Sequence, residues 1–190
     1  MAFQKLTMTQ ALVKYLMAQK RKLEETGEVV PLFGGVWAIF GHGNVAGLGE
    51  ALYPVRKEFP TFRGHNEQSM GHAAIAFAKA NRRQRMMACT SSIGPGAMNM
   101  VAASATAFAN RLPVLFLPGD IFATRSPDPV LQQIEHFGDP NISVNDCFKP
   151  VSRYYDRINL PEQLLSSLPQ AVNTLCDPVN CGPVTLALPQ

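Results

Sequence analysis

Charged side chains are scarce in this sequence. Asp, Glu, Lys and Arg make up 16% of its 190 residues, where about 25% is typical of soluble domains. The 17 Lys and Arg against 14 Asp and Glu leave a net charge of +3, too small an excess to predict nucleic-acid binding. A surface with so few charges tends to associate with other protein surfaces, so we expect a partner to cover part of it.

Cysteine is also sparse, and the sequence has no Cys-x-x-Cys pair. Only Cys176 and Cys181 lie close together in the sequence, with no histidine near them to complete a zinc site, and the histidines lack the spacing of metal ligands. We therefore expect reduced thiols in a cytoplasmic protein, and no metal held by this chain. The residues concerned are Cys89, Cys147, Cys176 and Cys181, and His42, His65, His72 and His136.

Long apolar runs are missing as well, so we expect no membrane partner. The first residues, MAFQKLTMTQ, lack the apolar core of a signal peptide. Residues 86–110 carry no charge, but Gly94-Pro95-Gly96 interrupt them, so they cannot form one continuous apolar helix. Hydrophobic residues still make up 46% of the chain, enough for a folded core, which excludes wholesale disorder.

Short apolar runs alternate with helical patterns along the chain. A first helix is expected over 9–26, capped by Thr7 or Thr9 and ended by Gly27. Further helices are expected over 67–82, 97–110 and 161–175, and strands over 36–40, 61–63, 86–90, 114–119, 151–154 and 184–188. This alternation predicts a single α/β domain over 1–190, with an open, doubly wound parallel sheet covered by helices on both faces.

Three loops of this fold follow a strand and precede a helix: 41–47, 64–67 and 91–96. Ligands of open α/β sheets bind at such carboxyl ends of strands. The first loop begins Gly41-His42-Gly43-Asn44, but its third glycine comes one position late for a dinucleotide fingerprint, and the chain has no P-loop. It predicts a glycine turn that a ligand can approach closely, or a tight turn without a ligand.

Glu67 opens the helix expected over 67–82. A carboxylate there complements the helix dipole, which alone accounts for the residue type. Behind it, Gly71, Ala74 and Ala78 share one smooth face. We expect this face to approach either the equivalent helix of a second subunit or the chain's own sheet. At a subunit junction Glu67 would be partly desolvated and would hold a proton more readily, ready to share it with a ligand nitrogen.

The third loop reads TSSIGPGAMN over 90–99, and it strings Ser, Gly and Pro before an apolar helix. Free backbone N–H groups at such a helix start favour acceptor groups of a ligand. His42 and His65 lie in the first two loops, where they could transfer protons, although a structural role is common for a single histidine. The sequence contains no G-x-S-x-G nucleophile elbow.

Taken in order, these loops resemble the pyrimidine-binding (PYR) domain of thiamine diphosphate enzymes of the acetolactate synthase type. The resemblance covers essentially the whole chain. VWAIFGHGN resembles the family's first strand and glycine turn, and GHNEQSMGHAAIAFAKA the segment with its cofactor-activating glutamate. TSSIGPGAMN resembles the family's TSGPGATN loop with an insertion, and NRLPVLFLPGD, FKPVSR and GPVTLALPQ complete the series.

The resemblance implies roles for particular residues. Glu67 would hydrogen-bond the aminopyrimidine ring of thiamine diphosphate and favour its imino form, with His42 or His65 serving substrate or proton transfer. Mg²⁺ would be held by the diphosphate-binding domain of a second subunit, because the Gly-Asp-Gly…Asn motif is missing here. This chain would then be the N-terminal part of a longer three-domain enzyme, a homodimer or homotetramer, and inactive alone. The implied cofactor contacts are Gly43, Asn44, Glu67, Gly94, Pro95, Asn99 and Gln132.

Two departures argue against an acetolactate synthase. Gly41-His42-Gly43-Asn44 replaces the Tyr-Pro-Gly-Gly turn of acetolactate synthases, and Leu131-Gln132-Gln133 replaces their Phe-Gln-Glu. The combination of IFGHGNVAGLGEAL and RGHNEQSMGHAAIAFAKA instead resembles members that cleave a carbon–carbon bond of a trihydroxylated cyclic 1,2-diketone with water, giving a deoxyglucuronic acid in myo-inositol catabolism. The alternatives are another thiamine diphosphate enzyme, such as an acetolactate synthase or a 2-keto acid decarboxylase, and a non-catalytic module that kept the fold.

Overall fold

A six-stranded parallel sheet forms the centre of the molecule in the computed structural model, which describes residues 4–124, 131–134 and 136–190. The strand order is β4-β3-β5-β6-β8-β7, and every neighbouring pair is parallel. The open parallel sheet predicted from the sequence is confirmed. The strands are β3 (Phe33–Ala38), β4 (Thr61–Arg63), β5 (Met86–Ser91), β6 (Leu115–Asp120), β7 (Tyr154–Arg157) and β8 (Val184–Pro189).

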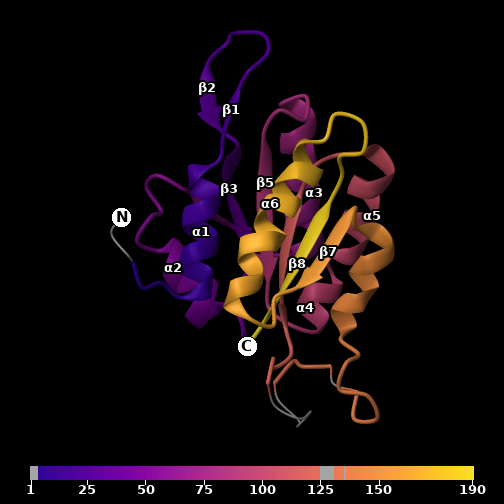
Figure 1. Ribbon diagram of the computed structural model, residues 1–190. Helices are drawn as coiled ribbons and strands as arrows, with labels where there is room; N and C mark the ends of the chain where they lie inside the picture. Colours follow the sequence, from indigo (N-terminus) through magenta and orange to yellow (C-terminus); the bar gives the residue numbers. More distant parts are fainter. Residues whose placement is uncertain (1–3, 125–130, 135) are drawn as a thin grey trace.

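Helices cover both faces of this sheet (Figure 1), as a doubly wound fold requires. One hydrophobic core joins the sheet to α1 (Met8–Ala18), α2 (Glu50–Leu52) and α6 (Leu164–Cys176). A second core joins it to α3 (Glu67–Ala80) and α5 (Val101–Asn110). Every residue of the central strands β5 and β6 is buried, which explains why both strands read as apolar runs without alternation.

The chain reverses its winding direction between β3 and β5. The next strand after β3 is β4, which pairs on one side of it, whereas β5 pairs on the other. Ala38 at the end of β3 is in register with Arg63 of β4 and with Thr90 of β5. The loops that follow these three strands therefore start at the same edge of the sheet. Such a switch point opens a crevice where ligands of this fold class bind.

The N-terminal helix is shorter than expected. Thr7 caps it through a capping box with Gln10, but the helix ends at Ala18 rather than near residue 26. Residues of the missing half form an antiparallel hairpin of β1 (Lys20–Lys22) and β2 (Val29–Pro31). Gly27 has φ +70° and lies in the connection between the two strands, where its N–H donates to the carbonyl of Leu23, so the glycine that we expected to end the helix serves the hairpin turn instead.

Two further expectations were wrong at their boundaries. The helix expected over 97–110 is two helices, α4 (Pro95–Met98) and α5, because the chain turns at Asn99. The strand expected over 151–154 lies later, at β7, because Ser143 caps a 3-10 helix η2 (Val144–Val151) in its place. The other connections are a π-helical turn η1 (Val45–Gly49), which leads into α2, and a 3-10 turn η3 (Pro161–Gln163), which leads into α6.

The smooth face of α3 packs inside its own chain. Gly71, Ala74 and Ala78 are all buried, and a Cβ on Gly71 would lie 2.5 Å from the Cβ of Ala103 on α5. The face therefore lets α5 approach α3, so its placement against a second subunit was wrong. Glycine allows an approach that a Cβ would block, and here the neighbour that comes close is α5.

The β3–β4 edge of the sheet carries an aromatic pair. The rings of Trp37 and Phe62 lie with centroids 5.2 Å apart and planes tilted by 37°, a spacing at which aromatic rings attract each other. Both residues belong to the strands that lead into the first two loops.

In the described part of the chain, no helix is both long and apolar enough to span a membrane.

Candidate functional site

A pocket of about 760 Å³ opens where the loops after β4 and β5 meet. Such a volume is within the range of small-molecule sites. Glu67 is the ionisable residue among the side chains described around it, and the rest of the lining mixes amides and a hydroxyl with apolar groups. The lining residues are Glu67, Ser92, Pro95, Gly96, Met98, Asn99, Gln132 and Ile134.

Glu67 is placed by the start of α3. The side chain of Asn66 caps the helix by accepting from the backbone N–H of Ser69 at 2.9 Å. The carboxylate of Glu67 is half-buried, and its Oε2 accepts a hydrogen bond from Asn99 Nδ2 at 2.9 Å. The helix dipole and this amide hold one carboxylate oxygen in place. Oε1 remains for a ligand in the pocket.

Gly94 joins the loop after β5 to the far wall of the pocket. It has φ +59° and ψ −121°, and a Cβ on it would lie 1.8 Å from the carbonyl oxygen of Gln132. Only glycine fits such a contact with backbone. Pro95 follows at the first turn of α4, where its fixed φ suits a helix start. The Gly-Pro-Gly pattern thus brings two segments of chain together around the pocket.

Gln132 forms that far wall in a left-handed backbone conformation, with φ +63°. A residue other than glycine rarely adopts such a φ unless its surroundings hold it there. Its Oε1 would lie 3.7 Å from a Cβ on Gly41, so the side chain reaches toward the first loop. Gln132 therefore spans the opening between the loops after β3 and β5.

The segment that carries Gln132 is anchored at its base by a buried carboxylate. Asp120 is 1% exposed at the end of β6, and its Oδ2 lies 3.0 Å from Arg157 Nε on β7. Its Oδ1 accepts from the hydroxyl of Ser143 and from the N–H of Ile121. The two ends of segment 121–143 thus meet at one side chain. Burial, and then the charge of Asp120, raise the pKa of the Tyr155 phenol nearby.

The first loop lies against this pocket with its asparagine in the core. Asn44 is 2% exposed, and its Nδ2 donates to Thr90 Oγ1 at 2.9 Å and to the carbonyl of Ser91 at 2.8 Å. Gly43, with φ +104°, packs on Ile93. Both residues hold the loops after β3 and β5 together, so a direct cofactor contact stays a prediction for them.

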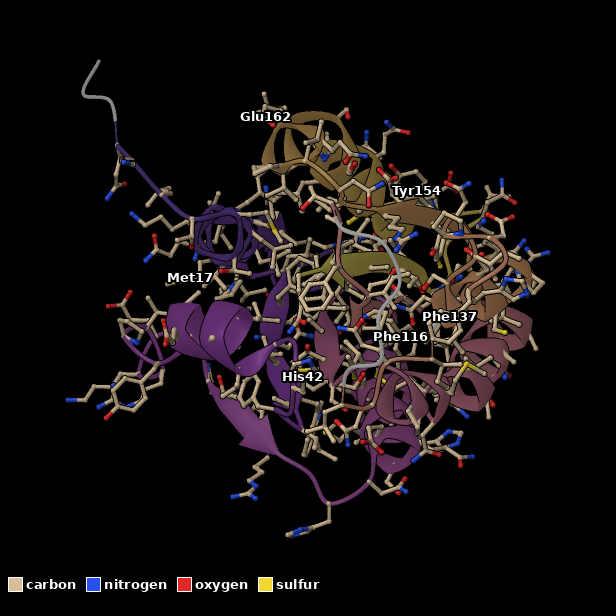
Figure 2. All side chains as sticks on the ribbon, turned by 90° about the horizontal axis from the view of Figure 1, so that it is seen from below. Met17, His42, Phe116, Phe137, Tyr154 and Glu162 are labelled. Atoms are coloured by element: carbon tan, nitrogen blue, oxygen red, sulfur yellow. The ribbon has the colours of Figure 1, made fainter. Side chains whose placement is uncertain are left out.

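The histidines lie in different surroundings. His42 is half-buried, and its Nε2 is enclosed without a hydrogen-bond partner among the described residues. Figure 2 looks onto the carboxyl ends of the strands and shows His42 near the middle of that view. His65 is exposed on the short loop between β4 and α3. Neither residue lines the pocket directly.

The structure brings together four of the predicted cofactor contacts at the pocket: Glu67, Pro95, Asn99 and Gln132. Sequence reasoning missed Ser92, Gly96, Met98 and Ile134. The first three lie in or beside the TSSIGPGAMN loop, so that motif already contained the signal. Ile134 had none, because it comes from a segment that reads as an irregular connection.

Comparison with known proteins places these residues in a family. Residues 36–139 match the family described as thiamine pyrophosphate enzyme, N-terminal TPP binding domain. The chain is 54% identical over 186 residues to 3D-(3,5/4)-trihydroxycyclohexane-1,2-dione hydrolase 2 of Bacillus cereus. Hydrolases of this name from Clostridium tetani and Geobacillus thermodenitrificans are 53% and 55% identical. Each match covers 98% of this chain but 29% of the relative.

Proposed function

We propose that this chain, which belongs to the thiamine pyrophosphate enzymes by its N-terminal TPP binding domain, is the cofactor-activating part of a carbon–carbon bond hydrolase. The substrate we assign is trihydroxycyclohexane-1,2-dione, a cyclic 1,2-diketone of myo-inositol catabolism, opened to a 5-deoxyglucuronate. The names of the relatives support this substrate. The chain spans 29% of their length, so the reaction belongs to the longer enzyme.

The arrangement of Glu67 is the observation that carries the proposal. Asn99 occupies Oε2 at 2.9 Å, and the carboxylate borders a pocket of about 760 Å³. Oε1 is therefore the atom that we assign to the N1′ nitrogen of the aminopyrimidine ring. There Glu67 shares a proton with the ring, and Asn99 keeps the carboxylate from rotating away.

The pocket's chemistry fits that ring. A flat heterocycle needs apolar contact on its faces and hydrogen-bonding groups at its edge. Pro95, Met98 and Ile134 offer the apolar contact, and Glu67 with Ser92 offers the polar groups. When bound, thiamine diphosphate supplies the electron sink for carbon–carbon bond cleavage. The chain's own part is to orient the ring, exclude water from it and hold its proton.

His42 and His65 are candidates for proton transfer to the substrate. His42 is the better placed, because it follows Gly41, and a Cβ on Gly41 would lie 2.8 Å from Ser92 Cβ in the pocket wall. Its Nε2 also lacks a hydrogen-bond partner among the described residues, so it can take one from a ligand or a moving side chain. His65 is exposed and would need a covering partner to act.

Other parts of the enzyme complete the site in this proposal. The described lining contains no basic side chain, so we place the diphosphate and Mg²⁺ on a further domain of a second subunit, in a homodimer or homotetramer. Leu131 and Phe137, on the segment beside the pocket, are 71% and 69% exposed, which suits a surface that another domain covers. The free cysteines support a cytoplasmic setting.

Glu67→Gln in the full-length enzyme tests the proposal. An amide cannot share the proton, so turnover of the cyclic diketone should fall by roughly a hundredfold or more, with an unchanged melting temperature. Exchange of the cofactor's C2 proton, followed by NMR, should slow in parallel. Glu162→Gln is the matched control, because Glu162 is exposed on η3 and is not among the residues that line the pocket.

The outcomes separate the parts of this proposal. Exchange at the wild-type rate in the Glu67→Gln enzyme would remove Glu67 from cofactor activation. Slow exchange in the variant, with a wild-type enzyme that does not open the cyclic diketone, would keep the cofactor role and refute the substrate. The Glu162→Gln enzyme should match the wild type in both measurements.

A further inference from the structure

A buried ion pair joins the ends of β6 and β7. The side chain of Asp120 on β6 is 1% exposed, and that of Arg157 on β7 is 18% exposed. Oδ2 and Nε lie 3.0 Å apart, but neither atom makes a hydrogen bond among the described residues, so charge attraction joins them. Replacing such a pair by apolar side chains is often neutral or stabilising. Stability is therefore a weak reason for this pair, and the other contacts of Asp120 point to a second role.

The second oxygen of Asp120, Oδ1, connects the end of β6 to the start of η2. It accepts from the N–H of Ile121 at 2.8 Å and from the hydroxyl of Ser143. Ser143 is 2% exposed, and its hydroxyl also accepts from the N–H of Asn145 and so caps η2. The side-chain amide of Asn145 donates back to the carbonyl of Gly119 at 2.8 Å. One carboxylate thus fixes where the chain leaves β6 and where it enters η2.

Both parts of the chain that Asp120 fixes lead to the wall of the pocket. The 3-10 helix η2 packs against α4, and α4 contributes Pro95 and Met98 to the lining. The segment between β6 and η2 contributes Gln132 and Ile134. Asp120 is not among the described lining residues, so it can act on a ligand only through these walls.

We propose that Asp120 is a positioning residue, which holds α4 and the Gln132 segment at the separation that the bound ring needs. The inference rests on the proposed function, which makes the ligand thiamine diphosphate. Arg157 holds the carboxylate in place, and Ser143 carries its position to η2. Without the link to Ser143, fewer molecules present both walls in the binding arrangement. The apparent dissociation constant then rises by the inverse of that fraction.

Ser143→Ala in the full-length enzyme tests this role. Calorimetric titration with thiamine diphosphate and Mg²⁺ should give a dissociation constant about threefold to tenfold above that of the wild type, as expected if about a third to a tenth of the molecules keep the binding arrangement. Ser167→Ala is the matched control. Ser167 is 0% exposed on α6, outside the pocket lining, and its hydroxyl likewise donates to a carboxylate, that of Asp156.

The two variants lose the same kind of hydrogen bond, so both should melt at a lower temperature than the wild type. The control should nevertheless keep the dissociation constant of the wild type. A Ser143→Ala enzyme whose dissociation constant stays within about twofold of the wild type overturns the positioning role. An equal rise in Ser167→Ala also overturns it, because the rise would then reflect lost stability alone.

If Ser143→Ala does not fold, Ser143→Cys keeps the size with a weaker donor, and the same outcomes apply to it. An enzyme that binds the cofactor but does not cleave the diketone would refute the proposed reaction and leave this test valid. A wild-type enzyme that does not bind thiamine diphosphate refutes both.

Discussion

Replacing Gly94 with alanine should separate the loop after β5 from the wall of the pocket. With φ +59° and ψ −121°, Gly94 occupies a backbone region that other residues adopt only under strain. An added methyl group would lie 1.8 Å from the carbonyl oxygen of Gln132. Backbone cannot rotate out of the way as a side chain can, so the segment with Gln132 must move or the loop must change its path.

The free energy of unfolding should fall for two reasons. Strain at this φ and ψ costs about 1–3 kcal/mol, and the forced shift of packed neighbours costs about 1–3 kcal/mol more. The sum, about 2–6 kcal/mol, is a large part of the roughly 5–15 kcal/mol by which domains are stable. Because each kcal/mol shifts the melting temperature of a domain this long by about 2–4 °C, we expect a drop of roughly 4–24 °C.

Thermal unfolding followed by circular dichroism measures this effect, and Gly49→Ala is its control. Gly49 has helical φ −60° and ψ −45°, and an added Cβ would make ordinary contact with the Phe40 ring at 3.5 Å. That substitution should stabilise the protein by about 0.4–1 kcal/mol. A Gly94→Ala protein that melts within about 2 °C of the wild type would refute the backbone contact between Gly94 and Gln132.

Two more predictions concern the core. Ala74→Leu should lower the free energy of unfolding, measured in urea, by about 1–3 kcal/mol, because Ala74 is 0% exposed on α3 and the added carbons have no space. Ala76 is exposed on the same helix, so Ala76→Leu should change this free energy little. Equal effects of the two substitutions would contradict the internal packing of the Ala74 face. Iodoacetamide should label the exposed Cys147 in the native protein but not Cys89, because burial raises the pKa of the Cys89 thiol; mass spectrometry of the labelled peptides checks this, and early labelling of Cys89 would contradict it.

The parallel sheet was predictable because its central strands are buried on both faces. Residues 86–91 and 115–119 are apolar or small throughout, and such runs bounded by glycine and proline indicate interior strands. The N-terminal hairpin was not predictable in the same way. Its first strand is Lys20-Arg21-Lys22, which carries no apolar alternation, and its pairing with Val29–Pro31 is a tertiary fact. Charged residues next to a helical pattern read as more helix.

The candidate site, like the fold, could be predicted only in part from the sequence. The sequence motif already places Glu67 and Asn99 in loops of one edge, and the structure joins them by a hydrogen bond. The sequence motif does not distinguish Ser91 from Ser92, although the two side chains have different surroundings. The Ser91 hydroxyl bonds the carbonyl of Ser92 at 2.9 Å, whereas the Ser92 side chain lines the pocket. Which of two adjacent serines faces the pocket depends on the backbone conformation at the end of β5, and the sequence motif does not predict that conformation.

The aromatic pair on the β3–β4 edge gives the chain an optical property of its own. Trp37 is the single tryptophan of the sequence, and its ring lies beside Phe62 on an edge strand. Indole emission responds to the polarity of its surroundings, so the tryptophan fluorescence of this chain reports on one known position. A domain that covers the β4 edge would shift the wavelength of this emission, whereas a change confined to the surroundings of α6 would leave the wavelength unchanged.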